Sequence, residues 1–132
     1  MSVSNWENLA SQAANIDAQV EATWKQLNSD LSAAVDAING KVAENSPHRL
    51  SINSEQDSTG LVSKNGRTAV FSLNRANSTL AVVTSWQVNA QFMLRDGSLA
   101  PYGTQYPNLA PGRTNFPTGE LVERVIKDVD LL

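Results

Sequence analysis

Hydrophobic residues recur about every 3.6 positions along the first 40 residues, and this spacing predicts one long amphipathic helix over residues 5–39. A coiled-coil seam over the whole length would need a spacing of 3.5, which would place Thr23 and Asp30 on the apolar face. The pattern therefore indicates a nearly straight helix that packs on a sheet or on another helix. The apolar positions are Trp6, Leu9, Ala13, Ile16, Val20, Trp24, Leu27, Leu31, Val35 and Ile38.

The length of this helix leaves two interpretations open. Residues 5–39 would form a rod of about 50 Å, whereas a globule of this size has a diameter of roughly 35 Å. An unbroken helix would expose Trp6, Leu9 and Ile16, and apolar side chains in that position indicate an interface with a second copy or with another protein. The alternative is a break around residues 28–30 that folds the helix back into an α-hairpin.

From residue 47 to residue 99 the hydrophobic period changes to two, which predicts an antiparallel sheet of four to five strands in meander order. Residues 56–60 have the composition of a turn. Asn65-Gly66 lies between two strand-like runs and predicts a hairpin, because both residues tolerate positive φ. The alternation over residues 80–95 is longer than a usual strand, so we expect a bulge or bend near Asn89 that splits it into two strands or wraps it across the sheet.

Trp86 lies in the middle of the apolar face of this long alternation. Its residue type and position are typical of a core aromatic. The alternative is that Trp86 forms the floor of a pocket between the helix and a curved sheet, which would take a small apolar ligand.

Residues 100–117 contain four of the five prolines and show neither a helical nor a strand period. A loop of this length is typically functional or an ordered connection that packs on the edge of the core. Tyrosine, phenylalanine and arginine supply rigid contact area and a forked hydrogen-bond donor at binding surfaces. The candidate binding residues of this loop are therefore Tyr102, Tyr106, Arg113 and Phe116.

The last 15 residues predict a short helix that begins at Thr118, because hydrophobic residues from Leu121 to Val129 form one stripe. Together the elements predict a single α+β domain over residues 1–132. It consists of an N-terminal helical segment at 1–46, an antiparallel sheet at 47–99, a proline-rich loop at 100–117 and a C-terminal helix at 118–132.

Composition narrows the function classes. The chain of 132 residues has no cysteine, which excludes disulfides, thiolate nucleophiles and zinc sites that need sulfur. We find no signal peptide and no apolar run near the roughly 20 residues of a membrane span, so we expect a cytoplasmic protein without membrane contact. The net charge is −3 and the basic residues are dispersed, so we expect no nucleic-acid partner.

Chemical motifs are absent from the sequence: there is no glycine-rich phosphate loop, no nucleophile elbow and no metal-ligand spacing. We predict no catalytic, cofactor-binding or metal residue. The sequence favours a small non-enzymatic protein-interaction or self-association module, as a homodimer or with a protein partner, that uses the long helix and the 100–117 loop. The alternatives are a small-molecule-binding domain with a pocket between helix and sheet, and an enzyme of unknown class that uses His48 with an unidentified carboxylate.

Overall fold

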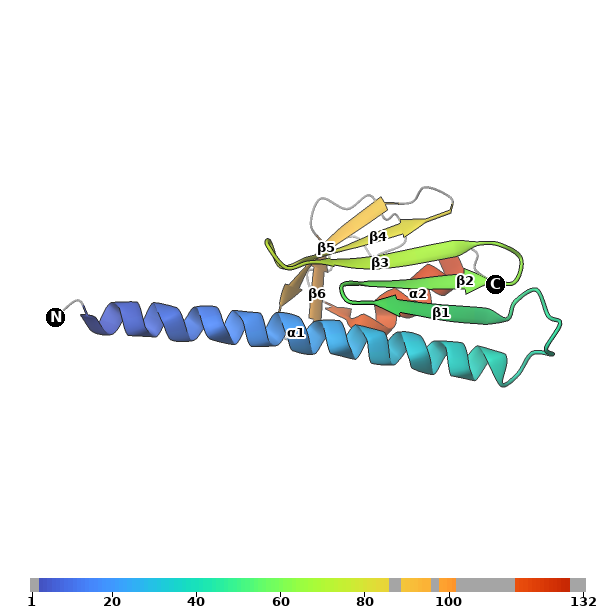
Figure 1. The fold of residues 1–132 in the computed structure, drawn as a ribbon, viewed down its shortest axis with the longest axis horizontal. Helices are drawn as coiled ribbons and strands as arrows, with labels where there is room; N and C mark the ends of the chain where they lie inside the picture. The colour runs from blue at the N-terminus through green and yellow to red at the C-terminus, as the bar shows by residue number, and fades with distance from the viewer. Residues whose placement is uncertain (1–2, 86–88, 96–97, 102–115, 129–132) are drawn as a thin grey trace.

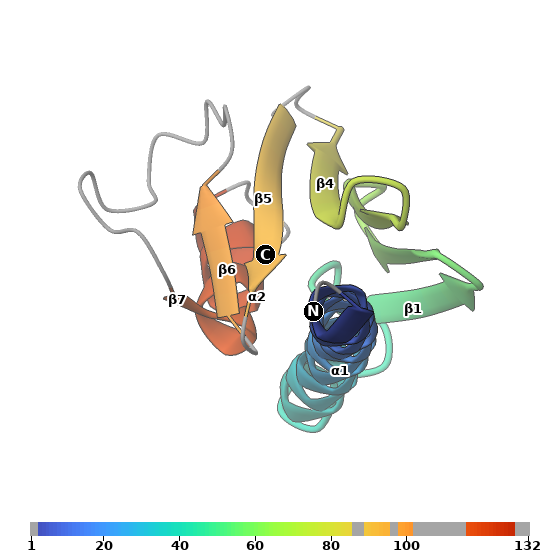
Figure 2. The same ribbon diagram turned by 90° about the vertical axis from the view of Figure 1, so that its left-hand side faces the viewer.

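The computed structural model describes residues 3–85, 89–95, 98–101 and 116–128. In these residues seven strands form one antiparallel sheet in the order β1 to β7, which arches over two helices (Figures 1 and 2). The predicted α+β class and meander order are confirmed, and the sheet has more strands than the expected four to five. The elements are α1 (Val3–Asn39), β1 (Leu50–Glu55), β2 (Ser58–Ser63), β3 (Thr68–Asn74), β4 (Thr79–Thr84), β5 (Asn89–Arg95), β6 (Ser98–Pro101), β7 (Phe116–Pro117) and α2 (Thr118–Asp128).

The long alternation over residues 80–95 accounts for part of the difference in strand number. It forms the hairpin β4–β5, in which Leu80 pairs with Phe92 and Val82 pairs with Ala90. The expected division into two strands near Asn89 is therefore confirmed, but the two strands pair as a hairpin instead of being joined by a bulge or bend or wrapping across the sheet. Because paired residues are both even-numbered or both odd-numbered, the even-numbered side chains of the two strands still share one face. The predicted apolar face is thus kept although the strand is divided.

Two predicted turns have a different form in the structure. The β1–β2 turn consists of residues 56–57 alone, because Glu55 pairs with Ser58, so residues 58–60 belong to β2 and not to a turn. The hairpin at Asn65-Gly66 is confirmed, but of these two residues Gly66 alone has a positive φ, of 91°. The Ser63 N–H donates to the Arg67 carbonyl oxygen (2.9 Å) and closes a three-residue loop. Such a loop needs one residue with positive φ, whereas a two-residue type I′ turn needs two.

Helix α1 is continuous over 37 residues, so the proposed break around residues 28–30 is wrong. The polar side chains that suggested the break form hydrogen bonds within the helix. Asn28 Nδ2 donates to the Trp24 carbonyl oxygen (2.9 Å), and Gln26 Nε2 donates to Asp30 Oδ1 (3.0 Å). The helix ends at Asn39, the last residue of the predicted range. No helix among the described residues is long and apolar enough to cross a membrane.

The core fills the space between the inner face of the sheet and the two helices. The predicted stripe of α2 lies in it, since Leu121 and Val125 are fully buried, whereas Val129 lies outside the described residues. Side chains from both helices and from strands β1 to β6 contribute. The largest fully buried side chains are Phe71, Phe92, Leu27, Leu31, Leu61, Leu80, Leu99, Leu121, Val82, Val125 and Thr23.

Candidate interaction surface

The N-terminal part of α1 projects beyond the rest of the protein as a free rod (Figure 1). We call residues 3–19 the overhang, and the sheet with the remaining helices the body. Every side chain from Asn5 to Ala18 is exposed, and the helix becomes buried at Val20. At 1.5 Å per residue the overhang is about 25 Å long. The helix therefore extends into solvent by more than four turns.

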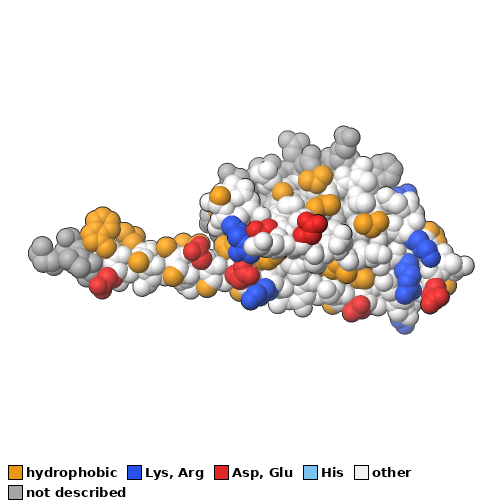
Figure 3. Space-filling model, viewed as in Figure 1, with side chains coloured by type: hydrophobic (Ala, Val, Ile, Leu, Met, Phe, Trp, Pro, Cys, Tyr) orange, Lys and Arg blue, Asp and Glu red, His pale blue; other side chains and the backbone are white. Residues whose placement is uncertain are grey.

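Three large hydrophobic side chains lie on the overhang. Their exposed fractions are 69% for Trp6, 54% for Leu9 and 53% for Ile16. Together with Ala13 they form a stripe that leads to Val20, and helical geometry places all of them within about 40° of the direction of Val20. The stripe therefore faces the side of α1 on which the sheet lies, and a group of hydrophobic side chains stands on that side of the rod (Figure 3). That these residues contact a partner stays a prediction.

The apolar stripe of α1 has two parts with different spacing. From Trp6 to Val20 it advances by three and four residues in turn, which is the spacing of a coiled-coil seam. The next seam position would be Thr23, whose side chain is fully buried and whose Oγ1 donates to the Gln19 carbonyl oxygen (2.8 Å). From Trp24 onward the stripe is displaced by one residue and packs on the sheet of its own chain. The overhang alone therefore keeps a coiled-coil pattern.

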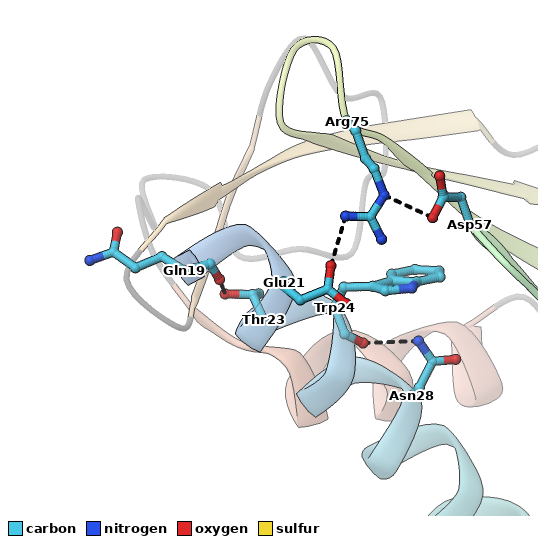
Figure 4. Close-up of polar contacts among 7 residues, drawn as sticks. All are labelled: Gln19, Glu21, Thr23, Trp24, Asn28, Asp57 and Arg75. Atoms are coloured by element: carbon cyan, nitrogen blue, oxygen red, sulfur yellow. Dashed lines mark hydrogen bonds and ion pairs between the residues drawn. The ribbon is translucent and has the colours of Figure 1, made fainter. Parts of the chain in front are cut away.

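Arg75 connects α1 to the body at the base of the overhang (Figure 4). Its Nη1 donates to Glu21 Oε2 (2.7 Å) and its Nε donates to Asp57 Oδ1 (3.0 Å). Glu21 lies on α1, Asp57 lies in the β1–β2 turn, and Arg75 follows β3, so three elements meet here. The hydrogen bond with Glu21, and then that with Asp57, raises the pKa of Arg75 above its ordinary value. These exposed ion pairs are weak, but they define where the overhang leaves the body.

A second polar contact joins α1 to the sheet about two turns further along the helix. Thr59 Oγ1, on β2, donates a hydrogen bond to Asn28 Oδ1, and the amide group of Asn28 is in turn held by the carbonyl oxygen of Trp24. Thr59 is buried, so its hydroxyl group needs such a partner. Sequence analysis missed this contact because its two residues lie on different elements.

Of the other candidate binding residues, the part of the chain that the structure describes includes Phe116 alone. Trp86, Tyr102, Tyr106 and Arg113 lie outside the described residues. Phe116 begins β7, where its backbone pairs with Leu99 of β6. The ends of the predicted 100–117 loop are therefore strands, which its sequence did not indicate because β7 is only two residues long.

Two apolar grooves lie on the C-terminal half of α1, where sequence analysis did not expect them. One, of about 330 Å³, separates α1 from α2, and its lining includes Ala34, Ala37, Val122 and Ile126. The other, of about 540 Å³, lies at the end of α1 and is lined by Ala37, Ile38, Lys41, Val42 and His48. The alanines of α1 are the signal that could have indicated them, because small side chains leave space between helices. The space between α1 and the sheet is instead filled by packed side chains.

Among the described residues, no three histidine or acidic side chains are placed to hold a metal ion. The side chain of His48 is exposed, and its backbone N–H donates to Ser46 Oγ (3.1 Å). A scan for known protein families finds no match, and searches of curated proteins and of solved structures find none either. Arguments about function therefore rest on the geometry of this chain.

Proposed function

We propose that this protein is a non-enzymatic interaction module whose contact surface is the apolar stripe of the overhang. The observation that carries the proposal is the exposure of Trp6, Leu9 and Ile16 on an unbroken helix. A helical segment of this length that packs against nothing is marginal in water, and large apolar side chains are stabilised when they leave water. A partner that covers the stripe would stabilise the helix by packing against it and would remove the apolar side chains from water.

The chemistry of the overhang favours a helical or grooved partner. Apolar side chains at positions i, i+3, i+7 and i+10 are the anchors of a helix that lies in a groove or against another helix. The opposite side of the overhang carries polar, mostly uncharged side chains such as Asn8, Ser11 and Asn15. These side chains would remain in solvent, so the partner would cover one side of the rod.

The test compares two double variants that replace residues by serine on opposite sides of the rod. Trp6→Ser with Leu9→Ser removes the two anchors nearest the N-terminus, and Asn8→Ser with Asn15→Ser is the matched control. We expect the first variant to lose both self-association, measured by light scattering over a roughly hundredfold concentration range, and the capture of partner proteins. The control should keep them. If the Trp6 and Leu9 variant retains both properties, the proposal is wrong.

A second candidate function is the binding of a small apolar ligand, supported by the two grooves on the C-terminal half of α1. A ligand there would contact Ala37, which lines both grooves. We expect Ala37→Trp to fill this space and to abolish any thermal shift that a screen of apolar compounds detects in the unmodified protein. A shift that persists in Ala37→Trp would exclude the grooves as the binding site.

A further inference from the structure

We propose that the occupant of the overhang is a second copy of this chain, and that the two overhangs pair antiparallel. In this arrangement Trp6 faces the partner's Ile16 and Leu9 faces the partner's Ala13. The inference rests on the proposed function and adds to it the identity of the partner and the geometry of the complex. Four observations support it: the direction of the stripe, the burial of neighbouring residues, the charges of the overhang and the contact area.

The direction of the stripe excludes parallel pairing. The stripe faces the same side of α1 as Val20, and from Val20 onward that side is covered by the sheet. A parallel partner helix on the stripe would continue into the space that the sheet occupies. An antiparallel helix ends there instead, because the partner's Val3 comes level with Gln19, just before the body begins. The body of the partner then lies beyond the N-terminus of the first chain.

Burial within each chain determines the register. Val20 is 5% exposed and Thr23 is fully buried, so neither side chain is available to a second copy. One antiparallel register pairs all the remaining seam positions with one another, and in it the large Leu9 packs on the small Ala13. The available positions are Trp6, Leu9, Ala13 and Ile16.

Charge favours the same arrangement. The overhang carries Glu7 and Asp17 and no basic residue. Parallel pairing would place Asp17, which flanks the stripe, level with its own counterpart, and like charges at the same level repel; Glu7 lies on the far side of the rod. In the antiparallel register Glu7 comes level with the partner's Asn15, and Asp17 comes level with the partner's Asn5.

The contact area indicates a reversible dimer. Two overhangs that bury the exposed parts of their Trp6, Leu9 and Ile16 side chains would remove roughly 700 Å² from solvent in total, which is below the roughly 1,000 Å² of a stable specific interface. The dimer should therefore form in a concentration-dependent way. Each chain should also keep its fold as a monomer, because the core does not include the stripe.

A distance measurement between the two copies tests the geometry. Ser29 is exposed on α1 and the chain has no cysteine, so Ser29→Cys provides one unique site for a spin label. In the antiparallel dimer the two labels would lie roughly 55 Å apart along the helix axis, as follows from the helical rise. In a parallel dimer they would lie within about 25 Å, because paired helices are separated by only 8–10 Å. We expect the distance of roughly 55 Å between the two labels in the dimer that forms at protein concentrations up to about 1 mM.

Two labelled control variants make every outcome informative. Trp6→Ser with Leu9→Ser should weaken the association by more than about 30-fold, whereas Asn8→Ser with Asn15→Ser should leave it unchanged. A short distance between labels would overturn the antiparallel geometry but not the proposed function. A monomer at all concentrations would overturn the second copy as occupant, and partner capture would then decide the proposed function separately. A long distance that persists in the Trp6 and Leu9 variant would overturn both.

Discussion

Thr118 Oγ1 donates a hydrogen bond to Asp30 Oδ2, which joins the first residue of α2 to the middle of α1 across 88 positions of sequence. The same carboxylate accepts a hydrogen bond from Gln26 through its other oxygen. It also lies beside Gly119, where an added Cβ would be 3.6 Å from Asp30 Oδ2. A negative charge at the N-terminus of a helix is favourable. Asp30 therefore positions α2 against α1, and with it the groove between the two helices.

Asp30→Ala should destabilise the protein by about 1–2 kcal/mol, because it leaves the buried Thr118 hydroxyl without this acceptor. Urea unfolding followed by circular dichroism measures the change. Asp30→Asn is the matched control, since it keeps an acceptor oxygen and should cost less. Equal stability of the alanine variant and the unmodified protein would show that α2 is positioned by its apolar stripe alone.

The side chain of Asn39 forms two hydrogen bonds with the backbone of Leu50, the first residue of β1, as a neighbouring strand would. Its Nδ2 donates to the Leu50 carbonyl oxygen (2.8 Å), and its Oδ1 accepts from the Leu50 N–H (2.9 Å). Asn39→Ala removes both partners from a buried residue and should cost about 1–3 kcal/mol. Hydrogen exchange of the Leu50 amide should become faster, while exchange in β4 should change less. Unaltered protection of Leu50 would contradict this role. Asn39→Asp, which keeps only the acceptor, should be intermediate.

The two parts of α1 should respond differently to the same substitution. Leu31 is fully buried against the sheet, so Leu31→Ala should lower the free energy of unfolding by about 2–5 kcal/mol. Leu9 is 54% exposed, so Leu9→Ala should change it by no more than about 0.5 kcal/mol in dilute solution. Denaturant unfolding at low protein concentration compares the two variants. A large cost at Leu9 under these conditions would mean that the overhang packs on its own body.

The contribution of Arg75 should depend on salt and should not depend on pH near neutrality. A raised pKa means that its stabilising effect is complete below the ordinary arginine pKa and is lost only as pH rises through the higher folded pKa. Arg75→Gln should therefore lower the melting temperature slightly. Because Arg75 stays charged between about pH 7 and about pH 10, its ionisation should not change the size of this decrease across that range. The difference should shrink at about 1 M salt, because exposed ion pairs are screened. A difference that grows with salt would be incompatible with this account.

Much of the fold could be predicted from the sequence because its signals are local. The 3.6-residue period identified the face of α1, the two-residue period identified the strands, and the stripe from Leu121 to Ile126 identified the buried side of α2. The same signals placed Trp6, Leu9 and Ile16 on the apolar face. Each of these inferences depends on residues that are close along the chain, so the sequence alone determined them.

Tertiary structure decided which apolar positions are covered and by what. Periodicity shows that Ile16 and Val20 lie on one face, but the body begins at Val20 and leaves Ile16 in solvent. Asn28 and Asp30 suggested a break, yet their side chains are satisfied by Thr59 and Thr118, which lie 31 and 88 residues away. Such partners depend on long-range packing, which no local pattern encodes. The exposed stripe of the overhang is therefore a property of the whole fold.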